Sequence, residues 1–185
     1  MRKGGIMTEE QAVDAGEIRL EPAKLGESAA CFAVICEGRA FQGEQGILQW
    51  TENYPTEDAV REDIEAGRGY KIMCGDALAG YLCVDFAGDP LYMRIRGAWH
   101  TGEPYVVVHR MAFTRAFRGK GLASVVFGLV EEMSRARGVR FFRVDTDETN
   151  ARMQHVLEKC GFARCGIVEY PGDQGEKVAF DKTIG

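Results

Sequence analysis

The segment best suited to chemistry is a basic, glycine-containing turn, Arg118–Ala123, which joins an apolar run to an amphipathic one. The start of a helix gathers unpaired backbone N–H groups and the positive end of the helix dipole. Gly119 and Gly121 let the backbone approach a ligand closely, and Arg118 and Lys120 add positive charge. This combination predicts a cradle for a phosphate or diphosphate group.

Three phosphate-loop patterns compete for this turn, besides an ordinary strand-to-helix connection with a solvated basic edge. The Walker loop fails because Gly121 follows Lys120 and the required earlier glycine is missing. The dinucleotide pattern G-x-G-x-x-G fails because its third glycine is replaced by Ser124. The pattern R-x-x-G-x-A fits, with Arg118, Gly121 and Ala123 in its fixed places.

The elements around the turn are well marked by hydrophobic periodicity. An apolar strand is expected before it, followed by a helix with one continuous apolar stripe, a strand, a second helix that Gly161-Phe162 closes, and two final strands. The expected ranges are 105–113, 122–137, 139–145, 150–160, 162–169 and 177–184.

The N-terminal half is expected to supply a strand, two helices and a hairpin. The first helix should bury Leu25, Ala29, Phe32, Ala33 and Cys36, and Thr56 should cap the second. Residues 1–16 are expected to form a flexible arm, and residues 17–185 a single domain. The expected ranges are strand 17–21, helix to 36, loop 42–55, helix 56–66, strands 70–74 and 78–86 joined by Gly75-Asp76, and loop 87–102.

Together, the R-x-x-G-x-A loop, its flanking elements and Lys159-Cys160-Gly161-Phe162 resemble the GNAT superfamily of acetyl-CoA-dependent N-acyltransferases. The resemblance is good over residues 104–164, and over residues 17–103 it extends to element order alone. It implies an α/β (α+β) fold with a mixed, mostly antiparallel central sheet of about seven strands and helices on both faces. The implied order is strand, helix, helix, three strands, helix, strand, helix and two strands.

The resemblance also implies acetyl-CoA as co-substrate. The strand around 111–113 should splay away from the next strand near Val144, so that the pantetheine arm lies in the gap. The diphosphate should rest on the amides of 118–123, and a strand N–H should polarise the thioester carbonyl. The implied coenzyme-binding residues are Met111, Ala112, Phe113, Arg118, Gly119, Lys120, Gly121, Leu122, Ala123, Ser124, Asn150 and Met153.

Amine acetylation needs a base for the protonated amine and an acid for the departing thiolate. His109 is the best candidate base, and Asp145 could orient it or pair with Arg110. The alternative is that these three residues form a structural hydrogen-bonded cluster. Relatives often carry an acidic tyrosine where this chain has Leu157, so Cys160, Tyr170 or water would have to substitute.

The acceptor is expected to be a primary amine, on a small molecule or a peptide. Gln49, Trp50 and Trp99 are candidate pocket residues. Residues 41–69 carry seven acidic residues and two arginines, and this acidic balance could attract a cation or simply belong to a solvated helix face.

Composition limits the remaining function classes. A net charge of −5 argues against nucleic-acid binding, and no apolar stretch approaches the ~20 residues of a membrane span. The six cysteines lack the spacing of a zinc site, so we expect no metal. The sequence shows no secretory signal, so we expect a cytoplasmic protein with reduced thiols. The leading hypothesis is an N-acetyltransferase, and the alternative is a non-catalytic acyl-CoA-binding module. A homodimer is compatible with either.

Overall fold

A single mixed sheet organises the computed structural model, which describes residues 17–185 apart from the side chain of residue 173. The expected arm at 1–16 lies outside the described residues. The helices are α1 (Ser28–Glu44), α2 (Glu57–Glu65), α3 (Leu122–Ala136) and α4 (Ala151–Lys159), with 3₁₀ turns η2 (Leu25–Glu27), η3 (Pro90–Arg94) and η4 (Gly172–Gln174). The strands are β1 (Ile18–Pro22), β2 (Gly69–Cys74), β3 (Ala77–Asp85), β4 (Arg96–Gly97), β5 (Tyr105–Phe113), β6 (Phe141–Asp147), β7 (Ala163–Glu169) and β8 (Glu176–Thr183).

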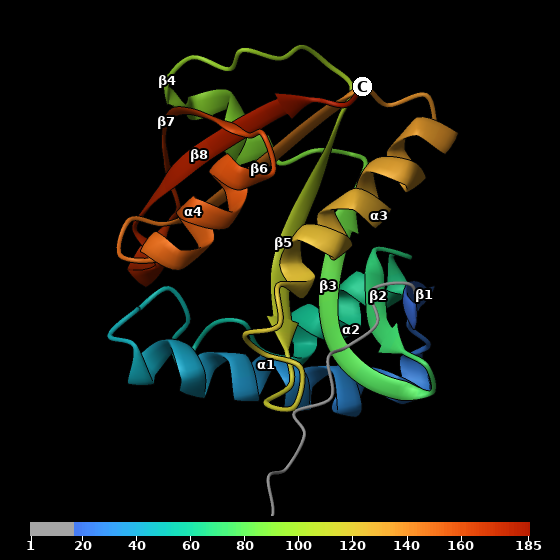
Figure 1. Ribbon diagram of the computed structural model, residues 1–185. Coiled ribbons are helices and arrows are strands. Elements are labelled where there is room, and N and C mark those ends of the chain that lie inside the picture. The colour runs from blue at the N-terminus through green and yellow to red at the C-terminus, as the bar shows by residue number, and fades with distance from the viewer. Residues whose placement is uncertain (1–16) are drawn as a thin grey trace, which may run out of the picture.

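The eight strands follow the order β1-β2-β3-β5-β6-β8-β7-β4, and all neighbours are antiparallel except β5 and β6. The parallel pair is short, because its register runs only from Tyr105↔Phe141 to Val107↔Arg143. Beyond that point β5 continues towards α1 while β6 turns away, which Figure 1 shows as a V opening below the label of β6. The predicted splay is therefore present.

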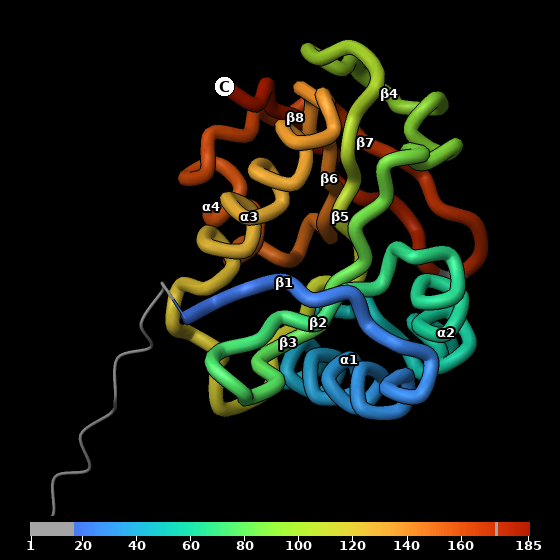
Figure 2. Tube along the Cα trace, turned by 90° about the vertical axis from the view of Figure 1, so that its right-hand side faces the viewer, coloured from blue at the N-terminus to red at the C-terminus, as the bar shows by residue number. Residues whose placement is uncertain are grey.

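Two pairs of helices cover opposite faces of the sheet. The first core cluster joins α3 and α4 to the sheet and includes Val126, Phe127 and Leu157, whereas the second joins α1 and α2 to β3 and β5. Figure 2 shows α3 and α4 on one side of the strands and α2 on the other. The predicted mixed α/β fold is confirmed, and no helix within residues 17–185 is long and apolar enough to cross a membrane.

The predicted buried face of α1 is wrong. The helix buries Cys31, Val34, Ile35 and Gly38, whereas Leu25 precedes it and is exposed. Apolar residues occupy two sides of this helix, so periodicity could not decide between them. The buried face is the one that carries Gly38. A Cβ added there would lie 2.9 Å from both Ala112 Cβ and the Trp50 ring, so only glycine allows this close approach to β5.

The sheet has one strand more than the expected seven. Arg96 and Gly97 form β4 and pair with Ile167 and Gly166 of β7, inside the segment expected to be a loop. Two residues carry no alternating pattern, so hydrophobic periodicity cannot detect such a strand. A side chain at Gly97 or Gly166 would collide with the backbone of the facing strand.

Candidate active site

A cleft of about 630 Å³ lies beside the free part of β5, between α1, the turn before α3, and α4. Lys120 and Ser124 are not among its lining residues, and the Lys120 ammonium lies 5.8 Å from the centre of the Phe117 ring. The other ten predicted coenzyme-binding residues line this one cleft: Met111, Ala112, Phe113, Arg118, Gly119, Gly121, Leu122, Ala123, Asn150 and Met153.

The turn before α3 has the conformation that its glycines allow. Gly119 and Gly121 have φ angles of 77° and 73°, in the left-handed region that other residues avoid, and Gly121 occupies the N-cap of α3. The Arg118 amide donates to the Thr114 carbonyl over 3.1 Å. The first N–H groups of α3 have no helical acceptor, so they and the helix dipole form a site for an anion.

Two arginines flank an aromatic ring at the mouth of this cleft. The Arg118 guanidinium lies 4.5 Å from the centre of the Phe41 ring and 3.6 Å from the Glu37 carboxylate, and the Arg152 guanidinium lies 5.6 Å from the same ring. The sequence reasoning missed Phe41 and Arg152. The available signal was the place of Arg152 in the first turn of α4, directly after the predicted Asn150.

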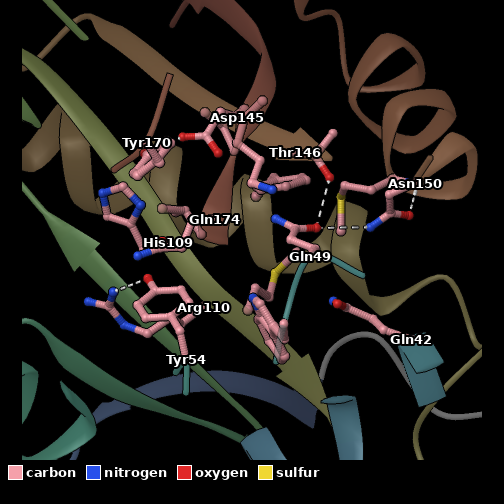
Figure 3. A pocket seen from close by; sticks show the side chains of 17 residues that line it. Gln42, Gln49, Tyr54, His109, Arg110, Asp145, Thr146, Asn150, Tyr170 and Gln174 are labelled. Atoms are coloured by element: carbon pink, nitrogen blue, oxygen red, sulfur yellow. Dashed lines mark hydrogen bonds between the residues drawn. The ribbon is translucent and has the colours of Figure 1, made fainter. Parts of the chain in front are cut away.

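A smaller inner cavity of about 80 Å³ lies next to the cleft, and Figure 3 shows the side chains that line it. Most of these side chains come from β5, β6, the segment 49–54 and the chain after β7, and the others come from α1, α3, β8 and the start of α4. They include the predicted His109, Asp145, Gln49 and Trp50, together with Tyr170. The two spaces adjoin, because both are lined by Gln42, Trp50, Met111, Asn150 and Met153.

A network of carboxylates and tyrosines forms one wall of the inner cavity. Asp145 Oδ2 accepts hydrogen bonds of 2.7 Å from both the Tyr92 and Tyr170 hydroxyls. The Tyr170 oxygen also lies 3.0 Å from Asp89 Oδ2, and its single proton can serve only one carboxylate at a time. Burial, and then the charges of Asp145 and Asp89, raise the pKa of Tyr170, so it keeps its proton at neutral pH.

His109 faces the same cavity from β5. Its Nε2 lies 3.6 Å from Asp89 Oδ2, and among residues 17–185 Asp89 is the acidic residue within 4.0 Å of the imidazole. Burial lowers the pKa of His109 below its ordinary value of 6.5, although Asp145 and Asp89 act in the opposite direction. The imidazole is therefore neutral at pH 7 and can accept a proton. Asp89, which the sequence reasoning missed, occupies the place expected for Asp145.

Arg110 does not pair with Asp145, contrary to that alternative. It donates to both oxygens of the buried Asp63 over 2.8 and 2.6 Å, and to the Tyr54 hydroxyl over 2.8 Å. Its φ of 53° marks a bulge in β5, where the register with β3 shifts. The expected cluster of His109, Arg110 and Asp145 is thus split between two carboxylate networks. Figure 3 shows Arg110 beside Tyr54, and Asp145 beside Tyr170.

Of the three predicted acceptor residues, Gln49 and Trp50 line the site and Trp99 does not. Gln49 Oε1 lies 3.4 Å from Thr146 Oγ1 and 3.5 Å from Asn150 Nδ2, and Trp50 lines both spaces. Trp99 is not among the lining residues of either space. Its ring packs at a tilt against Tyr92, with the ring centres 4.9 Å apart, and its indole N–H donates to the Tyr92 carbonyl, so its place does not fit the expected pocket role. None of the acidic residues of 41–69 lines either space.

The position of the usual tyrosine is closed to solvent and to the cavity. Leu157 is completely buried in the main core, and Cys160 packs against that same core. Of the two side chains expected to substitute as acid, Tyr170 lines the inner cavity and Cys160 does not.

Comparison with known proteins gives consistent results. The sequence matches the Acetyltransferase (GNAT) family over residues 40–162. A GNAT acetyltransferase structure from Streptococcus agalactiae is 32% identical, with a TM-score of 0.78 over 90% of this chain and 95% of that chain.

Two further structures share the fold at lower identity. Aminoglycoside acetyltransferase AAC(6')-Ib, in complex with coenzyme A and kanamycin, is 23% identical over 90% of this chain and 94% of its own, with a TM-score of 0.65. An acetyltransferase from Salmonella typhimurium that modifies the N-terminal serine of a ribosomal protein is 17% identical over 94% and 99%, also with a TM-score of 0.65. No curated protein matches.

Proposed function

Because this chain belongs to the acetyltransferase (GNAT) family and is an acyltransferase that uses acetyl-CoA, we propose that it acetylates a primary amine by direct attack in a ternary complex. Two proteins of the same fold support an amine as acceptor, since one structure holds kanamycin and another enzyme modifies an N-terminal serine. A small molecule and a peptide both remain acceptors under this proposal.

The coenzyme occupies the large cleft in this proposal. Its diphosphate binds the N–H groups that open α3, with Arg118 and Arg152 at the mouth adding positive charge. Its pantetheine arm follows the edge of β5 beyond Val107, where pairing with β6 has ended and backbone groups can bind the arm's amides. The thioester then reaches the junction of the two spaces near Met111, where a β5 N–H polarises its carbonyl.

His109 serves as the base. The neutral imidazole takes a proton from the ammonium form of the acceptor, and the free amine attacks the thioester carbon to form the tetrahedral intermediate. The nearby Asp89 stabilises the imidazolium that results, because an opposite charge favours the charged form. As the intermediate collapses, the attacking nitrogen loses its second proton to solvent water, so that each turnover delivers one proton to the thiolate and one to solvent.

Tyr170 serves as the proton donor to the departing thiolate. Its raised pKa keeps the hydroxyl protonated until the thiolate forms, but also makes the transfer uphill. Asp89 contributes to that raised pKa, but it also lies between His109 and Tyr170, at 3.6 and 3.0 Å, so the net transfer can run from the imidazolium to the thiolate. A proton collected at the imidazole can return through Asp89 to the tyrosine oxygen.

The observation that carries this proposal is that the large cleft adjoins a cavity lined by His109 and Tyr170. Thiol release from acetyl-CoA, measured across a panel of small amines, aminoglycosides and N-terminal peptides, tests it. We expect release that depends on one class of amine and on His109. Tight coenzyme binding without release for any amine would contradict it.

The alternative expectation, a module that binds acyl-CoA without transferring the acyl group, does not fit an acyltransferase, and the buried Leu157 alone does not favour it because Tyr170 lines the inner cavity. Such a module predicts a coenzyme-dependent rise of the unfolding temperature and no turnover. The same amine panel separates the two, because only the enzyme releases thiol.

A further inference from the structure

Three side chains with metal-binding atoms converge at the sheet edge formed by β8, β7 and the segment after β4. They are His100, Cys165 and Asp181, and the ligand atoms of all three lie within 4.8 Å of one another. Cys165 belongs to β7 and Asp181 to β8, whereas His100 follows β4. None of them lines the coenzyme cleft or the inner cavity, so this cluster is separate from the proposed active site.

Asp181 presents one oxygen to the cluster and keeps the other for the backbone. Its Oδ2 accepts hydrogen bonds from the His100 amide (2.7 Å) and from the Thr101 amide and hydroxyl (both 2.9 Å). Its Oδ1 lies 3.0 Å from His100 Nδ1. Since Asp181 is almost completely buried, this hydrogen bonding fixes the direction of Oδ1.

The histidine uses a single nitrogen for both partners. His100 Nδ1 lies 3.0 Å from Asp181 Oδ1 and 3.4 Å from Cys165 Sγ. A catalytic Cys–His–Asp relay places the two partners on opposite ring nitrogens, so that a proton can pass through the ring. Here the two partners meet at one nitrogen, which suits a shared cation better than a relay.

Two of the three separations among these atoms are close to those of a zinc site, and all three are within 4.8 Å. Bond lengths of about 2.0–2.3 Å at tetrahedral angles place neighbouring ligand atoms ~3.3–3.6 Å apart. The observed separations of 3.0 and 3.4 Å are close to those edges. We propose that His100, Cys165 and Asp181 form a binding site for Zn²⁺, with water as the fourth ligand.

Exposure and charge agree with this assignment. The His100 side chain is 57% exposed, which gives the ion an entry path and leaves room for the water. On binding, the Cys165 thiol releases its proton to solvent, and the thiolate and the Asp181 carboxylate together balance the two positive charges. The neighbouring Arg143 donates to the carbonyls of Thr101 and Gly102.

Zinc in this position would fasten the segment after β4 to the sheet edge. Trp99, next to His100, packs at a tilt against Tyr92, and the Tyr92 hydroxyl donates to Asp145 in the inner cavity. The site therefore stabilises a wall of the acceptor cavity without touching it. Sequence spacing could not reveal it, because 65 residues separate His100 from Cys165.

Zinc titration of the chelator-treated full-length protein tests the site. We expect about one equivalent to bind, with a higher unfolding temperature in the presence of Zn²⁺. His100→Ala and Cys165→Ser should each weaken binding by about tenfold or more. His155→Ala and Cys36→Ser are matched controls, because they remove the same residue types elsewhere on the surface, and they should bind zinc like the wild type.

Co²⁺ supplies a second readout that does not depend on stability. The wild type should show thiolate-to-cobalt charge-transfer absorption, and Cys165→Ser should lack it while Cys36→Ser keeps it. Zinc affinity that is equal in the wild type and both ligand variants, or no zinc binding by the wild type, would overturn the proposal. Either result leaves the acetyl-transfer assay unaffected, so the two proposals fail independently.

Discussion

The two parts of the proposed site, the large cleft (the coenzyme end) and the inner cavity (the acceptor end), are built in different ways. At the coenzyme end, backbone groups form the proposed binding site. Two glycines with left-handed φ angles shape the turn, and the first N–H groups of α3 have no helical acceptor. At the acceptor end, side chains form the proposed catalytic network. They come from four separate segments and contact one another across β5 and β6: His109, Asp89, Asp145 and Tyr170.

This difference explains which end tolerates change. A backbone cradle constrains a few local positions and serves any protein that binds the same diphosphate. A side-chain network can be rebuilt from other segments, as it is here: the usual tyrosine position holds the buried Leu157, and Tyr170 reaches the cavity from the chain after β7. We therefore expect mutations at the acceptor end to act mainly on turnover, and mutations at the coenzyme end mainly on affinity.

The largest expected effect is at the base. His109→Ala should lower kcat/KM by about 10²- to 10⁴-fold, because general base catalysis contributes in this range. Coenzyme affinity, measured by calorimetry, should stay within about twofold. His155→Ala on the exposed face of α4 is the control, and a similar loss in both variants would remove His109 from the mechanism.

A smaller loss is expected at the proton donor. Tyr170→Phe removes the hydroxyl beside Asp145 and Asp89 but keeps the ring, and should lower kcat by about 10- to 100-fold. Steady-state kinetics at saturating coenzyme measures it. Tyr70→Phe, in the main core and outside both spaces, should retain full kcat. Unchanged kcat in Tyr170→Phe would assign thiolate protonation to water.

At the coenzyme end, Gly121→Ala should weaken binding of coenzyme A by about tenfold. The new Cβ strains a residue with a φ of 73°, at a cost of about 1–2 kcal/mol, and so disfavours the turn conformation that is proposed to receive the diphosphate. Gly128→Ala adds the same methyl group inside α3 without strain and should bind normally. Equal affinities would contradict the backbone cradle.

The smallest effect is a displaced pH profile. Because burial lowers the pKa of His109, the acidic limb of kcat/KM should lie below pH 6.5 and vanish in the residual activity of His109→Gln. The unfolded chain binds this proton more readily than the folded one, so the free energy of unfolding should also fall as the pH drops through about 6.5. A limb above pH 7 would contradict the direction of the shift.

The sequence predicted what depends on local pattern. The turn 118–123, the apolar stripe of α3, the Asn150 cap of α4 and the early end of the β5–β6 pairing all follow from spacing, glycine chemistry or the family resemblance. Local pattern also failed locally: α1 is apolar on two sides, and the close approach at Gly38, rather than periodicity, selects its buried face.

What depends on distant contacts could not be predicted. Asp89 lies in a segment without regular pattern, and only the folded chain brings it to His109 and Tyr170. Asp63 captures Arg110 from 47 residues away and so leaves Asp145 free for the tyrosines. Trp99 is predicted to line the pocket because it is a large aromatic residue in a loop, whereas its indole N–H donates to the Tyr92 carbonyl.

A crystal structure of the protein with acetyl-CoA tests the central claim most directly. We predict the diphosphate on the amides that open α3, the pantetheine arm between the diverging β5 and β6, and the thioester beside His109 and Tyr170. Closed pairing of β5 with β6 beyond Val107, or a coenzyme bound outside this cleft, would contradict the account.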